Sequence, residues 1–184
     1  MRWEMLFADL AGQLTVVEAL ELDSAVADLT RAETATISLE DRIRAAVGRP
    51  LQLLLVGGLD LHGELRETSS EWLLLVAAGR EVLVPLSAVE SLRGLGVRAA
   101  PGPGSPGAGR PSSVLSLGHA LRGIARDRTV VRVRTPHREY VGRINRVGRD
   151  HLDVVGVPLD GRGGAGPGDV VVVAFASIAH VTST

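Results

Sequence analysis

Few side chains in this chain of 184 residues have the types and spacing that catalysis or metal binding needs. No two of its five histidines stand in an i, i+4 pair, and no carboxylate lies at a spacing suited to zinc. Carboxylates such as Asp150 and Asp153 alternate around an expected strand, so they would not converge on one bond of a substrate. The absence of cysteine excludes a thiol nucleophile, a thiolate metal site and a disulfide framework. We therefore expect a protein that is not an enzyme, with no catalytic or metal-binding residue, no cofactor and no small-molecule substrate.

Arginine is the residue type that points most directly to a partner, because the chain has no lysine and its charges are segregated. Residues 1–41 carry two arginines against nine acidic residues, whereas residues 114–184 carry ten arginines against six. Basic side chains gathered in one domain favour anionic partners such as RNA or DNA. The candidate nucleic-acid-binding residues are Arg132, Arg134, Arg138, Arg143, Arg146 and Arg149. Arg132 and Arg134 alternate with valines, which is also the pattern of any half-exposed strand, so a solvated face stays open as an alternative.

Two apolar groups are candidates for a protein interface. Trp72 and Leu74 stand on the outward side of an expected strand, where covering them would stabilise the protein by roughly 1.5–3 kcal/mol each. An amphipathic helix expected over residues 3–37 carries a stripe at three- and four-residue spacing. The members of this stripe are Leu6, Leu10, Leu14 and Val17. We expect Trp72 to be covered by this helix, by another subunit or by the other half of the chain.

A linker rich in proline and glycine at residues 94–113 divides the chain, because its prolines exclude a regular helix. We expect an acidic helical region at 1–37, a first β domain with its own helix at 38–93, and a second such domain at 114–184. No apolar run approaches the roughly 18 residues that span a bilayer. The acidic residues that follow Met1 are also unlike a signal peptide. The expected location is the cytoplasm, with no membrane as a partner.

Short apolar runs predict successive strands in an antiparallel meander on each side of the linker. The strands expected in the first domain are 51–56, 59–67, 72–77 and 81–86. Those expected in the second domain are 129–135, 138–147, 151–157 and 169–175. A helix is expected before each meander, ending near Val47 in the first domain and covering 115–127 in the second.

The two domains align with each other as sequences, which indicates a duplication. When Gly63 is set against Gly142, no gap is needed from the second strand of each domain through the third, and Trp72 falls on His151. The first strand fits only after a shift of one residue in the hairpin that follows it. Chance similarity between strands rich in valine is the alternative explanation.

Two segments, GREVLVPLSAVESL and REYVGRINRVGRDHLDV, resemble the Sm-like fold of the Sm, LSm and Hfq proteins, over about 42–92 and 115–182. The spacing from Gly58 to Gly63 matches the second strand of that family, while His137 replaces the first glycine in the second copy. A glycine is needed where this strand bends, because a side chain would collide with the neighbouring strand. The resemblance implies a mainly β protein with N-terminal helices and two small five-stranded Sm-like or SH3-like barrels, each preceded by a helix.

The residues with which Sm-like proteins bind uridine are not retained in this chain. The family uses an Asp-x-x-x-Asn stretch and an Arg-Gly or Lys-His pair after strand four, where Leu86-Ser87 and Phe175-Ala176 stand here. The resemblance therefore does not predict RNA binding in a central pore, or the ring that forms such a pore. A helix followed by a small barrel is also the plan of other SH3-like adaptors.

These observations predict a non-enzymatic tandem Sm-like binding module that acts as a nucleic-acid-associated, RNA-binding regulator through its Arg-rich second domain. The alternative is a protein–protein adaptor or self-assembling scaffold that uses the N-terminal helix and the Trp72 face. The expected partner is RNA or DNA in the first case, and another protein or a further copy of the chain in the second. An affinity that falls steeply with salt would distinguish phosphate contacts from an apolar interface.

Overall fold

The computed structural model of the chain describes residues 34–100, 115–157 and 168–183. The chain divides into two units, Met1–Ser38 and Leu39–Thr184. In the first unit only residues 34–38 are described. The predicted interface stripe lies outside the described residues and stays a prediction; its members are Leu6, Leu10, Leu14 and Val17.

The unit Leu39–Thr184 is mainly β, as the sequence predicts. Its first half, residues 39–100, contains α2 (Leu39–Arg44), β1 (Pro50–Leu55), β2 (Leu59–Thr68), β3 (Trp72–Ala77), β4 (Arg80–Pro85), the 3-10 turn η1 (Leu86–Ala88) and β5 (Val89–Arg93). Its second half, residues 115–183, contains α3 (Leu117–Arg126), β6 (Val130–Arg134), β7 (Glu139–Val147), β8 (His151–Gly156), β9 (Val170–Ala174), the 3-10 turn η3 (Phe175–Ser177) and β10 (His180–Ser183). All eight strands expected from the sequence are present within a residue or two of their predicted ends. The apolar runs did not locate β5 and β10, the short last strands of each half.

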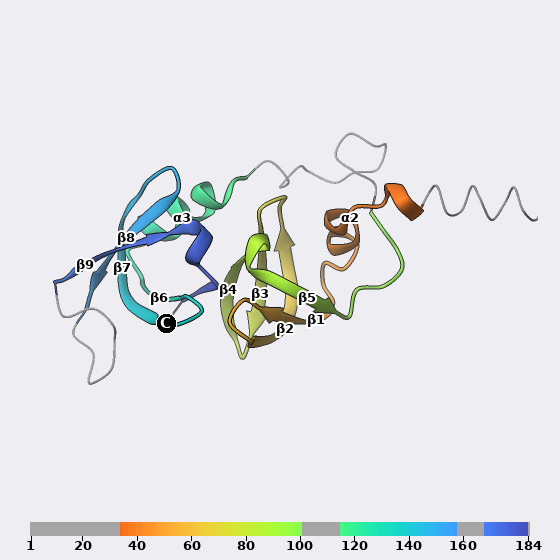
Figure 1. Cartoon of the computed structure of the whole chain (residues 1–184), viewed down its shortest axis with the longest axis horizontal. Helices are drawn as coiled ribbons and strands as arrows, with labels where there is room; N and C mark the ends of the chain where they lie inside the picture. The colour runs from red at the N-terminus through yellow and green to blue at the C-terminus, as the bar shows by residue number, and fades with distance from the viewer. Residues whose placement is uncertain (1–33, 101–114, 158–167, 184) are drawn as a thin grey trace, which may run out of the picture. The chain divides into compact units, whose positions relative to one another are not determined.

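The ten strands of the described part form one antiparallel sheet in the order β5-β1-β2-β3-β4-β10-β6-β7-β8-β9 (Figure 1). Each half contributes five neighbouring strands, and the strands of the two halves are not interleaved. The halves meet where β4 pairs with β10, with Leu83 opposite Val181 and Val82 opposite Thr182. Hydrogen bonding is therefore continuous from one half into the other.

The pairing registers of the two halves repeat each other. Leu51 lies opposite Gly63 in the first half, and Val131 lies opposite Gly142 in the second. When the two glycines are superposed, the first strands of the two halves are therefore displaced by one residue relative to the ungapped alignment. This confirms the shift of one residue predicted for the first hairpin. A bulge also interrupts the β2–β3 and β7–β8 pairings at equivalent places, after Leu65 in the first half and after Ile144 in the second.

The same steric constraint requires glycine at the bend of the second strand in each half, Gly63 and Gly142. A Cβ atom on Gly63 would lie 2.7 Å from the carbonyl oxygen of Val76, and one on Gly142 would overlap the carbonyl oxygen of Val155. Val76 and Val155 occupy equivalent positions on the third strand of each half. The predicted reason for glycine at these two positions is therefore confirmed.

The core consists of two apolar clusters, and the boundary between them differs from the boundary between the two halves of the sequence. The first is built around residues of the first half, including Ile43, Leu53 and Leu73, all fully buried. The second is built around Leu121 and the inward residues of β6 to β10, but it also contains Trp72 and Leu83 from the first half. The outer face of β3 and β4 thus belongs to the core of the second half.

Candidate nucleic-acid interface

The predicted arginines of β6 lie on one face of the sheet. Arg132 and Arg134 are half-buried, and they alternate with Val131 and Val133, which are buried in the second cluster. Val130, two residues before Arg132, lies opposite Arg143 on β7. Because side chains at every second position share a face, Arg143, Arg132 and Arg134 follow one another along the same side of β6 and β7.

An acidic side chain balances part of this row. Arg132 Nη1 lies 2.8 Å from Glu139 Oε1, and both side chains are about two-fifths exposed, so the pair contributes little to stability. Glu139 also lies opposite Arg134 in the register. The end of the row at Arg132 and Arg134 therefore carries less net positive charge than the sequence suggests.

His180 borders the same end of the row and stays neutral at pH 7. Burial, together with the positive charge of Arg134, lowers the pKa of this imidazole from its ordinary value of 6.5, and Glu139 opposes the shift. Its Nδ1 atom is buried and has no hydrogen-bond partner among the described residues. His180 consequently adds no charge to the basic face.

The strongest concentration of unbalanced positive charge lies at the other end of the row. Arg126, Arg128 and Arg143, together with Asn145, line a hollow of about 760 Å³ whose remaining wall comes from α3, β7 and β8. We call these four residues and the space between them the basic hollow. In the described part of the chain, none of the three guanidinium groups makes an ion pair or hydrogen bond.

Local structure explains how two of these arginines reach the hollow. The helix α3 begins at Ser116, whose side chain accepts a hydrogen bond from the His119 N–H, and it ends at Asp127. Arg126 lies in its last turn, where cations are favoured by the helix dipole. Arg128 follows in the left-handed conformation, with φ of 50°, at a position where glycine is usual. A left-handed non-glycine residue costs about 1–2 kcal/mol, so the arginine is kept there despite a conformational penalty.

The other predicted arginines do not join the basic hollow. Arg138 lines a separate hollow of about 470 Å³ with His137 and Tyr140. Arg146 is exposed and lies opposite Asp153 across the β7–β8 pairing. Arg149 is exposed next to Asp150.

The neighbourhood of Arg149 carries negative charge as well. A hydrogen bond with His151 lowers the pKa of the Asp150 carboxyl, and His151 Nδ1 lies 2.8 Å from Asp150 Oδ1. Arg149 therefore stands beside a carboxylate that stays ionised.

Of the six arginines predicted from the sequence, only Arg143 lines the basic hollow, and Arg126 and Arg128 were missed. The signal that could have found them is the Arg-x-Arg spacing at the end of a predicted helix, directly before a strand. Their approach to Arg143 depends on how α3 packs against β7, which periodicity does not reveal.

Trp72 and Leu74 are covered by the second half of the chain, one of the three covers considered from the sequence. Trp72 is only 4% exposed, and its Nε1 donates a hydrogen bond to the carbonyl oxygen of Leu115 at 2.9 Å. Glu71 accepts a hydrogen bond from the Leu117 N–H through Oε2 at 2.8 Å, which holds the start of α3 beside the indole. The description of Trp72 as an outward face is therefore corrected, because this face is internal to the chain.

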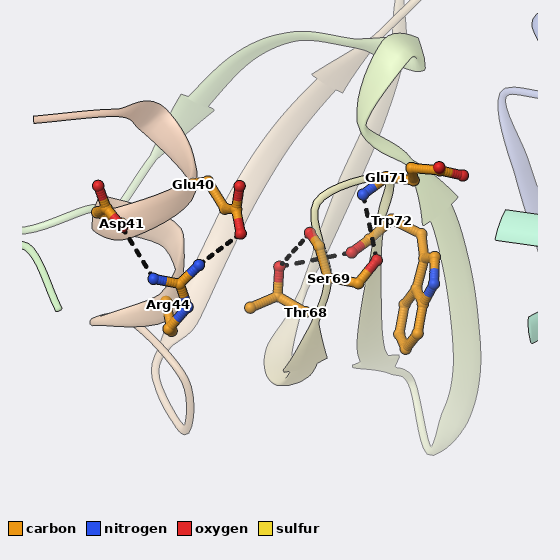
Figure 2. Close-up of polar contacts among 7 residues, drawn as sticks. All are labelled: Glu40, Asp41, Arg44, Thr68, Ser69, Glu71 and Trp72. Carbon is orange, nitrogen blue, oxygen red and sulfur yellow. Dashed lines mark hydrogen bonds and ion pairs between the residues drawn. The ribbon is translucent and has the colours of Figure 1, made fainter. Parts of the chain in front are cut away.

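The turn that presents Glu71 and Trp72 is itself fixed by buried hydroxyl groups. Figure 2 shows the Thr68 hydroxyl donating to the carbonyl oxygens of Ser69 and Trp72, while the Ser69 hydroxyl accepts from the Glu71 N–H at 3.1 Å. Thr68 and Ser69 are the buried polar residues of the described part. On the same half, Arg44 pairs with Glu40 and Asp41 within α2, so its charge is balanced (Figure 2).

Comparisons with known proteins leave the site to be judged on its own geometry. No protein-family model matches the chain, and a search of curated proteins found no significant similarity. Among the described residues there is no cluster of three or more side chains that could hold a metal ion. None of the helices described is both long and apolar enough to cross a membrane.

Proposed function

We propose that this chain is a non-enzymatic tandem Sm-like module that binds single-stranded nucleic acid, RNA in particular, through the basic hollow. Two five-stranded barrels are part of this proposal. They are supported by the repeated strand order, the repeated bulge and the equivalent bend glycines Gly63 and Gly142. The observation that carries the function is the convergence on one hollow of three guanidinium groups, those of Arg126, Arg128 and Arg143, that have no partner among the described residues.

A phosphate backbone fits this arrangement better than a single small anion does. Arginine presents planar donors that match phosphate oxygens, and unpaired arginines release no intramolecular ion pair when they bind. The row continues from Arg143 on β7 to its diagonal neighbour Arg132 on β6, about 7–8 Å away, and then to Arg134, about 6.6 Å further along β6 at 3.3 Å per residue. Such a track follows an extended strand of phosphates, which is the usual design of a single-strand groove.

The test is a titration of labelled single-stranded RNA and of duplex DNA with the whole chain and with two matched variants. Charge reversal in Arg126→Glu/Arg143→Glu should weaken RNA binding at least tenfold, because it places two carboxylates in the hollow. Arg93→Glu, an exposed charge reversal on β5, should leave the affinity within about twofold. Equal losses of RNA affinity in both variants would show that only the net charge of the protein matters, and the assignment of the site to the basic hollow would be wrong.

The protein-interaction alternative also has an observation in its favour, though on a different surface from Trp72. Val170 and Val172 on β9 are 58% and 63% exposed, and β9 pairs only with β8 among the described strands. An edge strand with exposed valines is a template for pairing with another strand. Val172 occupies the position equivalent to Leu83, which in the first half faces Val181 across the β4–β10 junction.

A second copy of the chain is the partner that this edge would accept, through pairing of β9 with the β5 edge of the next copy. Sedimentation of the whole chain and of Val172→Lys would test this candidate. If the valine edge associates, the mass should fall to that of one chain in the variant. A single-chain mass for both proteins would leave the adaptor function without this interface.

A further inference from the structure

A second concavity lies at the junction of the two halves, and it adjoins the basic hollow along residues 124–129 at the end of α3. Its volume is about 330 Å³, and it is enclosed by β3 and β4 of the first half together with α3, β6 and β10 of the second. We call this space the junction pocket. Its size is at the lower end of the range typical of small-molecule sites.

The inner wall of the junction pocket is apolar and well ordered by the sheet. Leu74 lies opposite Leu83, and Leu83 lies opposite Val181, so three side chains form one row across the β3–β4–β10 pairing. Trp72 and Ile124 complete this wall from β3 and α3. These residues belong to or pack on the second apolar cluster, so the pocket has a rigid apolar back.

The mouth of the junction pocket is polar and acidic. Glu81 is the next residue on the same face of β4 after Leu83, and Ser183 is the next on the same face of β10 after Val181. Asp127 and Thr129, which follow α3, lie at the same end. Because these groups come from the start of β4, the end of β10 and the start of β6, the register gathers them at one opening.

Both carboxylates at this mouth lack a cationic partner in the described part of the chain. Glu81 and Asp127 are exposed, and neither forms an ion pair or side-chain hydrogen bond there. Asp127 lies between Arg126 and Arg128, which line the basic hollow, whereas Glu81 has no such neighbours. An apolar back with two carboxylates that form no ion pair among the described residues is complementary to a molecule with an apolar body and a cationic head. The acidic segment 1–41, with nine acidic residues against two arginines, has the wrong charge to occupy it.

We propose that the junction pocket binds a small organic cation, an amine with an apolar body, whose ammonium group lies between Glu81 and Asp127. The apolar body lies against Trp72, Leu74 and Leu83. This site has its own lining residues, although its Asp127 lies between Arg126 and Arg128 of the basic hollow. Because it lies between the halves, an occupant contacts both of them at once.

The chain contains its own reporter for this site. It has two tryptophans, Trp3 and Trp72, so the variant Trp3→Phe leaves Trp72 as the only indole. Three probes share one apolar body and differ in their head group: phenylbutylamine, phenylbutanol and phenylbutyrate. We expect a saturable change in Trp72 fluorescence with phenylbutylamine, at least fivefold weaker binding of phenylbutanol, and still weaker binding of phenylbutyrate.

Variants of the mouth separate charge recognition from unspecific apolar binding. Glu81→Gln/Asp127→Asn should weaken phenylbutylamine binding at least fivefold and leave phenylbutanol unchanged. Glu90→Gln, an exposed acid on β5 outside the pocket, should change neither. The larger side chain in Ala120→Leu should reduce the binding of all three probes, with folding checked by circular dichroism.

The proposal is overturned by either of two results in the folded protein. One is equal binding of the amine, the alcohol and the carboxylate, which would indicate an apolar gap without a recognition site. The other is an amine affinity that Glu81→Gln/Asp127→Asn leaves unchanged, which would place the cation elsewhere.

Discussion

The two halves of the unit Leu39–Thr184 share one scaffold but differ in the side chains that it turns outward. On the third and fourth strands, the first half carries Trp72, Leu74 and Leu83. The equivalent positions of the second half carry His151, Asp153 and Val172. The first set packs into the apolar cluster of the neighbouring half, whereas the second set faces away from the junction.

This difference places the apolar face that joins the two halves on β3 and β4 of the first half. Burial of Trp72 and Leu83 contributes about 1.5–3 kcal/mol each to holding the halves together. In addition, the Glu71 carboxylate accepts a hydrogen bond from the Leu117 N–H at the start of α3, and the carbonyl oxygen of Leu115 accepts one from the Trp72 indole. A face with His151 and Asp153 does not bury itself in this way, since both are polar.

The charges of the two halves differ in a corresponding way. In the first half, Arg44 is paired with two carboxylates one turn earlier in the same helix. In the second half, three arginines around the end of α3 and on β7 have no such partner among the described residues. The proposed anion site therefore lies in the second half.

The largest effect on this comparison should come from the junction tryptophan. Trp72→Ala should lower the free energy of unfolding by about 3–5 kcal/mol, since it removes a large side chain from a packed core. The equivalent change His151→Ala should cost no more than about 0.5 kcal/mol, because this side chain is about two-fifths exposed. Chemical denaturation of both variants measures the difference, and similar losses would contradict the account of the junction.

The bend glycines should give the next largest effect. Gly142→Ala and Gly63→Ala should each lose about 1–3 kcal/mol, because a Cβ at either position meets a backbone carbonyl that cannot move easily. Gly142→Ala should lose more, since its Cβ would come closer to the opposing oxygen.

The control for these variants is Gly123→Ala in α3. No heavy atom lies within 4 Å of the Cβ position there, so alanine should stabilise the helix by up to about 1 kcal/mol. Thermal unfolding of the three variants checks the order. Stable Gly142→Ala protein would show that the bend tolerates a side chain.

The sequence predicted these glycines because steric demand at a bend is local. It likewise predicted the first four strands of each half, since alternating apolar residues specify a half-buried strand. It missed β10, whose residues His180–Ser183 contain one buried valine and take their place from pairing with β4 and β6. The cover over Trp72 and the approach of Arg126 to Arg143 depend on packing between distant segments, so no local pattern could give them.

A smaller effect should separate binding from stability at Arg128. Glycine relieves the left-handed strain of about 1–2 kcal/mol but increases the entropy of the unfolded chain by about 0.4–1 kcal/mol. Arg128→Gly should therefore stabilise the protein by up to about 1 kcal/mol while it weakens RNA binding.

Ala78→Gly provides the matched control, because Ala78 is the other described non-glycine residue with positive φ and lies in the β3–β4 turn, outside the lining of the basic hollow. It should stabilise the protein similarly and leave RNA binding unchanged. Melting temperature and RNA affinity are measured on the same samples. Loss of both in Arg128→Gly would indicate that this arginine supports the fold.

The smallest effect should be a pH dependence from His180. Its folded pKa is depressed, so the unfolded state binds more protons as the pH falls below 6.5, and stability should decrease with falling pH in that range. His180→Gln should reduce this slope, whereas His62→Gln, at an exposed position on β2, should not. Denaturation midpoints at pH 5 to 8 would show it, and an unchanged slope in His180→Gln would assign the effect to other groups.

The most direct test of the account is the salt dependence of RNA binding by the whole chain and its single arginine variants. For a single strand, each phosphate contact makes the negative slope of log affinity against log salt steeper by about 0.7. Arg126→Ala, Arg128→Ala and Arg143→Ala should each reduce the slope by roughly that amount, while Arg93→Ala should leave it unchanged. No measurable RNA binding at low salt, or a slope that these three variants do not alter, would contradict binding through the basic hollow.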